Sequence, residues 1–95
     1  MQVTCDFTPG SARLDNRCKA KLDEVGLRMR DKTDSQCQVT GFDETKGKQR
    51  LADQRAQAVK NYLVTRHGIG ASRIATDGQV TDRRAADIVL TIPNS

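Results

Sequence analysis

The sequence has no tryptophan and few other aromatic residues. Phe7, Phe42 and Tyr62 make up 3% of the 95 residues. Proteins that bind single-stranded nucleic acids stack bases on several aromatic rings. The formal net charge is +4, but the basic residues are spread along the chain rather than clustered. We therefore expect no nucleic acid as a partner.

Long apolar runs are also missing. No segment approaches the roughly 20 apolar residues that a transmembrane helix needs, so we do not expect this domain to insert directly into a membrane. Hydrophobic residues account for 36% of the chain and charged residues for 29%, which is typical of a water-soluble globular domain. A chain of this length can enclose one hydrophobic core but not two.

Histidine occurs once, as His67, which leaves little material for catalysis. No partner residues form a nucleophile constellation with it, and the close Cys-x-x-Cys pairs of zinc sites are absent. His67 precedes Gly68, and such a pair is typical of a helix C-terminus, where the imidazole faces the negative end of the helix dipole. We therefore predict no catalytic residue, no metal and no cofactor.

The three cysteines, Cys5, Cys18 and Cys37, each fall on an apolar face of an expected helix or strand. Three small core residues, with or without one disulfide bond, are the simplest interpretation. An odd number leaves at least one cysteine without a partner in the chain. The pairing stays open, because bridging depends on the separation of the Cα atoms.

Three segments alternate apolar and polar residues with the period of a strand that buries one face: residues 2–7, 37–42 and 86–92. We expect a further short strand at residues 73–76, followed by a loop at residues 77–82.

Two segments space their apolar-face residues three or four apart, as amphipathic helices do. The stripe of the first consists of Leu14, Cys18, Leu22, Val25 and Met29. The stripe of the second consists of Leu51, Arg55, Ala58, Val59, Tyr62 and Leu63. Either Asp15 or Asn16 can cap the first helix, and Gly26 is expected to weaken that helix by up to about 1 kcal/mol relative to alanine.

The expected order is strand, helix, strand, helix, strand, loop, strand. Each helix has one apolar stripe that it must bury, so both helices should pack against one face of the sheet. The sequence thus predicts an α+β sandwich.

The turn between the central strand and the second helix, residues 43–50, carries both signs of charge. It lies beside a helix N-terminus, whose free amide groups attract anions. This mixture would suit a zwitterionic ligand.

A motif spans this turn. Gly41, Phe42, Asp43 and Glu44 are followed by Leu51, Ala52, Asp53, Gln54, Arg55 and Ala56. This order resembles the Gly-x-Thr-Asp turn and the Leu-Ser-x-x-Arg-Ala helix start of the OmpA C-terminal-like domain, the peptidoglycan-binding module also found in Pal lipoproteins and MotB stator proteins. The resemblance covers nearly the whole chain, including Phe7, Ser11, Leu14 and Leu22 before the turn and Gly68, Ile69, Ser72, Arg73, Ile74, Asp82, Arg83 and Arg84 after it. The chain is similar to a divergent member with a shortened binding turn that lacks the family's asparagine.

The resemblance implies a βαβαβ(β) OmpA-like sandwich with two main helices on one face of a mixed sheet. Residues 1–95 would form a single OmpA-like domain of a larger envelope protein. Its location would be the periplasmic face of the bacterial outer membrane. The implied function is not enzymatic: it is the non-covalent binding of peptidoglycan, which anchors an outer-membrane or periplasmic protein to the cell wall. The alternative is a scaffold or self-association module, such as a homodimer, that has lost its ligand.

In that family the turn aspartate and the arginine of the Arg-Ala pair hold the free end of diaminopimelate in the peptidoglycan stem peptide. By position Arg55 matches the arginine, whereas the aspartate position falls on Glu44, with Asp43 one residue earlier. The resemblance thus implies a ligand site of Arg55, Glu44, Asp43 and Thr45. An arginine can bind a carboxylate through two parallel hydrogen bonds while an acidic side chain binds the ammonium group.

Each of these arginines also has a simpler interpretation. Arg55 could form a salt bridge with Asp53 or Glu44, or pack its stem on the core with its head in water. Arg83 and Arg84 could be strand-edge charges that keep the sheet soluble.

Overall fold

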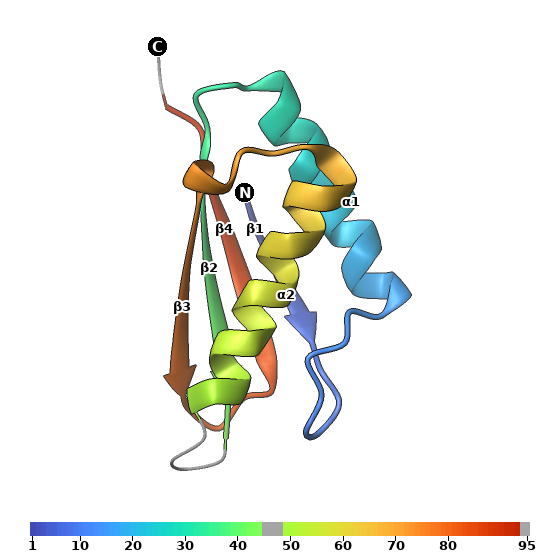
Figure 1. The fold of residues 1–95 in the computed structure, drawn as a ribbon, viewed down its shortest axis with the longest axis vertical. Coiled ribbons are helices and arrows are strands. Elements are labelled where there is room, and N and C mark those ends of the chain that lie inside the picture. The colour runs from blue at the N-terminus through green and yellow to red at the C-terminus, as the bar shows by residue number, and fades with distance from the viewer. Residues whose placement is uncertain (45–48, 94–95) are drawn as a thin grey trace.

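The computed structural model describes residues 1–44 and 49–93. The elements along this part of the chain are β1 (Gln2–Asp6), α1 (Asn16–Asp31), β2 (Gln36–Asp43), α2 (Gln49–His67), the 3₁₀ turn η1 (Ala71–Arg73), β3 (Ile74–Val80) and β4 (Ala85–Thr91). Both long helices lie on the same side of the sheet, and α2 runs diagonally across the strands (Figure 1). The structure therefore confirms the α+β sandwich that the sequence predicts.

The four strands form one mixed sheet in the order β1-β4-β2-β3. β2 and β3 pair in parallel, whereas β4 is antiparallel to both of its neighbours, β1 and β2. The apolar positions of the predicted stripes meet between the helices and the sheet, where Leu22, Met29, Val39, Leu63 and Ile88 are fully buried.

The first helix begins where the sequence suggests. Asp15 has extended backbone angles, and its side chain accepts a hydrogen bond of 2.7 Å from the amide of Cys18. Asp15, rather than Asn16, is therefore the N-cap. The second helix ends at His67, and Gly68 has a φ of 69°, the left-handed conformation expected of a C-terminal glycine.

The third strand is longer than predicted, because β3 continues to Val80 through the segment expected to be a loop. Asp77, Gly78 and Gln79 pair in register with Thr40, Gly41 and Phe42 of β2. These three residues show no apolar alternation, and of them only Gly78 is buried. Backbone pairing with the central strand β2 holds them in the sheet instead.

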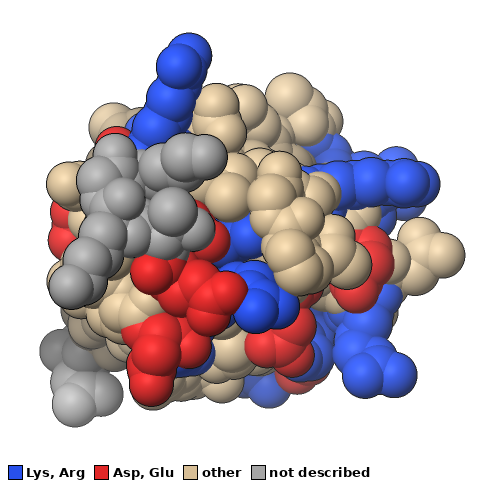
Figure 2. Space-filling model, turned by 90° about the horizontal axis from the view of Figure 1, so that it is seen from below, with Lys and Arg blue, Asp and Glu red and all other residues tan. Residues whose placement is uncertain are grey.

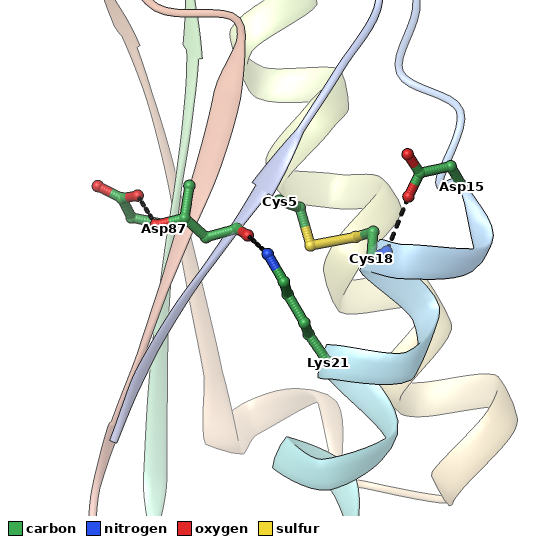
Figure 3. The surroundings of a disulfide bond; sticks show 6 residues. Cys5, Asp15, Cys18, Lys21 and Asp87 are labelled. Carbon is green, nitrogen blue, oxygen red and sulfur yellow. Dashed lines mark hydrogen bonds between the residues drawn. A yellow bond between two sulfur atoms is a disulfide. The ribbon is translucent and has the colours of Figure 1, made fainter.

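A disulfide bond joins Cys5 of β1 to Cys18 of α1, whose Cα atoms are 5.1 Å apart (Figure 3). Beside it, Lys21 donates a hydrogen bond of 2.7 Å to the carbonyl oxygen of Thr4, a second link between the same two elements. Cys37 remains a buried free thiol, and burial raises its pKa to about 11. The structure thus supplies the pairing that the sequence leaves open.

Neither α1 nor α2, nor any other helix within the described ranges, combines the length and the apolar character needed to cross a membrane.

Candidate functional site

The predicted site lies at the end of the sheet where β2 stops and α2 begins, at the lower end of Figure 1. Gly41 lets α2 approach the sheet there, because a Cβ atom at this position would collide with the carbonyl oxygen of Ala52. Gly78 of β3 likewise leaves room for Asp53. These two glycines seat the first turns of α2 on the sheet and so place Arg55, which follows one turn later, against the end of β2.

The Arg55 side chain is fully buried and forms the centre of the site. Its Nη1 donates to Asp43 Oδ1 at 2.9 Å and to the carbonyl oxygen of Phe42 at 2.7 Å. Its Nε donates to the carbonyl oxygen of Ser11 at 2.9 Å and its Nη2 to that of Thr8 at 3.2 Å. One guanidinium group thus holds together the end of β2 and the connection between β1 and α1.

Asp43, rather than Glu44, is the acidic partner of Arg55. Asp43 is 3% exposed and lies in the buried pair. Glu44, one residue later, is exposed and pairs instead with Arg84, whose Nε and Nη2 lie 2.8 Å and 2.6 Å from Glu44 Oε1. Thr45, the remaining predicted site residue, lies outside the described residues.

The simpler interpretations of Arg55 are wrong. Its ion pair is with Asp43 and not with Asp53 or Glu44, and its head is out of water. The signal for this burial is present in the sequence, since Arg55 shares the apolar stripe of α2 with Val59 and Leu63.

The expectation of Arg83 and Arg84 as strand-edge charges also needs correction. They precede β4, which is an interior strand, so they do not lie along a sheet edge. The Arg83 guanidinium lies 4.5 Å from the centre of the Phe42 ring and donates to both carboxylate oxygens of Asp87 at 2.8 Å. These hydrogen bonds lower the pKa of Asp87 and raise that of Arg83.

The two ion pairs of the site differ in environment. Breaking a buried pair such as Asp43–Arg55 costs about 3–5 kcal/mol, because an uncompensated charge stays behind. An exposed pair such as Glu44–Arg84 contributes only about 0–1 kcal/mol. Seen from this end, acidic and basic side chains lie side by side on the surface (Figure 2). The surface of the site therefore carries both signs of charge, and its base is a buried, hydrogen-bonded ion pair.

A pocket of about 540 Å³ opens beside the β1–α1 connection. Thr8 and Ser11, whose carbonyl oxygens bind Arg55, contribute to its wall, and so do Arg13, Asp15 and Lys19. The pocket is thus lined by apolar as well as polar side chains, carries both signs of charge, and shares a wall with the Arg55 network.

His67 takes no part in this site. Its Nε2 donates to Asp23 Oδ1 at 2.8 Å, and the Tyr62 hydroxyl donates to the same oxygen at 2.6 Å. The hydrogen bond from Tyr62, followed by that from His67, lowers the pKa of Asp23. His67 also packs against Gly26, where a Cβ atom would collide with the imidazole ring. The cluster joins α1 to α2, so Gly26 is a packing residue, a role beyond the helix weakening that the sequence suggests.

Across residues 1–44 and 49–93, no group of three or more His, Cys, Asp or Glu side chains could hold a metal ion.

Comparison with known proteins gives one family match. The model of the OmpA family matches residues 6–88, which include every residue of the predicted site. No curated protein sequence matches the chain significantly.

Solved structures with a similar fold come from several bacteria. The OmpA-like domain of FopA1 from Francisella tularensis subsp. tularensis SCHU S4 has a TM-score of 0.79 at 20% identity, over 96% of this chain and 72% of that one. The peptidoglycan-associated lipoprotein from Burkholderia pseudomallei has a TM-score of 0.77 at 18% identity, over 93% and 89%. The cell wall anchor of the T6SS from Pseudomonas aeruginosa has a TM-score of 0.74 at 20% identity, over 98% and 81%. At these identities the similarity establishes the fold.

Proposed function

This chain belongs to the OmpA family, as its sequence predicted, and on that premise we propose that it binds peptidoglycan non-covalently. Domains of this family are non-enzymatic, peptidoglycan-binding modules of the bacterial cell envelope. The observation that carries the proposal is the Asp43–Arg55 pair at the base of the β2–α2 turn, which lies inside the family match.

The names of two similar structures support the same partner. One is a peptidoglycan-associated lipoprotein and the other a cell wall anchor. By analogy, this domain would anchor an outer-membrane or periplasmic protein to the wall from the periplasmic face of the outer membrane.

The finer proposal concerns the ligand group. We propose that the site of Asp43, Glu44, Thr45 and Arg55 receives the free end of diaminopimelate, which carries an ammonium group and a carboxylate on one carbon. The acidic side chains suit the ammonium group, while the positive charge at this end of the molecule and the N-terminal amides of α2 suit the carboxylate.

Co-sedimentation tests the proposal. We expect the protein to pellet with diaminopimelate-type peptidoglycan at physiological salt, where weak attraction between exposed charges is largely screened. Lysine-type peptidoglycan, which lacks this carboxylate, should retain less protein, and free diaminopimelate should release what is bound. Arg28→Gln removes one charge from an exposed ion pair on α1, away from the site. As a control for the effect of net charge, it should pellet as the wild type does.

The opposite result would favour the alternative. If the protein stays in solution with both kinds of peptidoglycan, ligand binding has been lost and the fold serves as a scaffold. Sedimentation equilibrium would then show whether two copies associate.

A further inference from the structure

We infer that the pocket beside the β1–α1 connection binds a second carboxylate of the stem peptide, on the residue next to diaminopimelate, through Arg13 and Lys19. This inference rests on the proposed function and extends the site from the diaminopimelate end to a neighbouring stem residue. Two neighbours carry such a group. The D-glutamate before diaminopimelate has a free α-carboxylate, and the D-alanine after it has a terminal carboxylate.

The pocket adjoins the proposed site and has room for part of a peptide. Its volume is about 540 Å³, which is within the usual range of small-molecule pockets. Thr8 and Ser11 line the pocket and also bind the Arg55 guanidinium through their carbonyl oxygens. One extended residue spans about 3.5 Å. A stem peptide whose diaminopimelate end occupies the site can therefore place its next residue in the pocket.

The buried part of the pocket lining is apolar. Phe7 is 7% exposed and belongs to the hydrophobic core, and the partly buried Leu14 packs against that core. The methylene groups of D-glutamate or the methyl group of D-alanine can leave water against these two side chains. Such apolar surface beside a few charged groups is typical of a ligand pocket.

Two cations at the pocket have no partner within the described chain. Arg13 and Lys19 are exposed and line the pocket. Across residues 1–44 and 49–93, neither charged group donates a hydrogen bond or forms an ion pair. Their donors are thus available to a ligand carboxylate, which an arginine can bind through two parallel hydrogen bonds.

The two acidic residues that line the pocket form no ion pair with these cations. Asp15 is the N-cap of α1, and its Oδ1 accepts a hydrogen bond of 2.7 Å from the amide of Cys18 (Figure 3). Asp6 lies on β1 between the buried Cys5 and Phe7, so its side chain leaves the opposite face of the strand. A ligand carboxylate in the pocket would therefore displace no acidic partner.

The charges of α1 oppose its dipole, which is a second sign of a binding role. No acidic residue occupies the first turn, whereas Arg17 and Lys19 do. The N-terminal end of a helix is positive and ordinarily favours acidic side chains. Cations at this end cost stability, and departures of this kind are expected at functional sites. A bound carboxylate would offset the cost, because it interacts favourably with both the cations and the dipole.

The connection that carries the pocket is already held in place by the protein. The disulfide bond closes it at its base, and the Arg55 guanidinium binds it further along. Between these points the amide of Ser11 donates to the carbonyl oxygen of Thr8 at 3.2 Å, and the amide of Arg13 donates to Ser11 Oγ at 3.0 Å. These bonds reduce the entropy that ligand binding would cost.

Calorimetry with three muropeptides tests the inference. All three have a tetrapeptide stem that contains diaminopimelate. One keeps both neighbouring carboxylates free, one has the D-glutamate carboxylate converted to an amide, and one has the D-alanine carboxylate converted to an amide. The proteins are the wild type, a double variant with Arg13→Gln and Lys19→Gln, and a control with Arg28→Gln and Arg30→Gln. The control removes the same charge from the other end of α1, and urea unfolding shows that each variant is folded.

We expect the wild type and the control to bind one of the amidated muropeptides about tenfold or more weakly than the free one. The double variant at Arg13 and Lys19 should bind all three equally, a change that a merely structural role of these residues would not produce. The amide that weakens binding identifies which carboxylate occupies the pocket.

Two results would overturn the inference while the proposed function stands: equal binding of all three muropeptides by the wild type, or an unchanged preference in the double variant. If the wild type binds neither the muropeptides nor peptidoglycan, the inference and the proposed function fall together.

Discussion

At the scale of single residues, the site depends on the chemistry of one guanidinium. Arg55 supplies donors to four acceptors on two chain segments. Its fork is planar and carries five N–H groups, whereas a lysine ammonium is a single point with three. Phe7 adds its ring 5.2 Å from the guanidinium carbon. This set of contacts explains how a charged side chain can be fully buried in a small core.

Arg55→Ala should lower the free energy of unfolding by about 3–5 kcal/mol, because Asp43 would be left buried without its cation. Arg55→Lys should recover little of this loss, since one ammonium cannot reach acceptors on both segments. Urea unfolding measures both variants. Arg28→Ala, in an exposed pair, should change the free energy by less than about 1 kcal/mol. A stable Arg55→Lys protein would contradict the structural role given to the fork.

The buried thiol of Cys37 should lower the free energy of unfolding at alkaline pH. Burial raises its pKa from an ordinary value of 9.0 to about 11. A raised pKa in the folded state stabilises the fold fully below the unfolded value, and this contribution is lost as the pH rises from about 9 towards 11. The loss should amount to about 2–3 kcal/mol.

The difference between the wild type and Cys37→Ala isolates this contribution. Tyr62, whose pKa its bond to Asp23 raises, titrates in both proteins and therefore cancels. If the free energy of unfolding of the two proteins changes equally between neutral pH and pH 11, the assignment to Cys37 is contradicted.

At the scale of elements, glycines decide how closely helices approach their neighbours. Gly41 and Gly78 seat α2 on β2 and β3, and Gly26 seats α1 against the end of α2. At each position a Cβ atom would collide with a group across the interface. At Gly26, the cost in free energy of a glycine within a helix is therefore offset by close packing against α2 that a larger residue would not allow.

Gly26→Ala tests this balance. In an isolated helix the change would stabilise by about 1 kcal/mol, but here the new methyl group meets the buried His67 ring. We expect a net destabilisation of about 1–3 kcal/mol, as for other overpacked sites. In a His67→Ala background the same change should be neutral or stabilising, and a double-mutant cycle in urea measures the coupling. Stabilisation by Gly26→Ala in the wild type would show that the ring moves aside freely.

At the scale of the whole molecule, the site is assembled from segments far apart in the sequence. The β1–α1 connection contributes Thr8 and Ser11, β2 contributes Asp43, α2 contributes Arg55, and the residue just before β4 is Arg84. The Cys5–Cys18 disulfide closes the first of these segments into a loop. The loop is therefore braced covalently at its base and by Arg55 at its tip.

Reduction of this disulfide should lower the free energy of unfolding by about 3 kcal/mol, because a loop of this length regains conformational entropy in the unfolded chain. Unfolding with and without a reducing agent measures the change. A Cys37→Ala protein is the suitable host, since it has no free thiol to exchange with the bond. The amides of residues 7–15 should also exchange hydrogen faster after reduction. Equal stability in both states would show that α1 and Arg55 hold the loop without the bond.

The sequence by itself determined the helices, most of the strands and the faces they bury, because these follow from local periodicity and capping residues such as Asp15. The family followed as well, since the order of Gly41, Asp43 and Arg55 resembles its motif. The strand predicted at residues 73–76 was too short, because backbone pairing with β2, and not an apolar pattern, holds Asp77 to Val80 in the sheet.

Only the tertiary structure decided which acidic side chain pairs with Arg55 and which two cysteines form the disulfide bond. Asp43 and Glu44 are neighbours in the chain, but their side chains point to different surroundings, one to the buried Arg55 and the other to the exposed Arg84. The pairing of Cys5 with Cys18 and the packing of His67 on Gly26 likewise join separate elements. Such choices depend on distances between segments that meet only when the chain folds, and no local pattern encodes those distances.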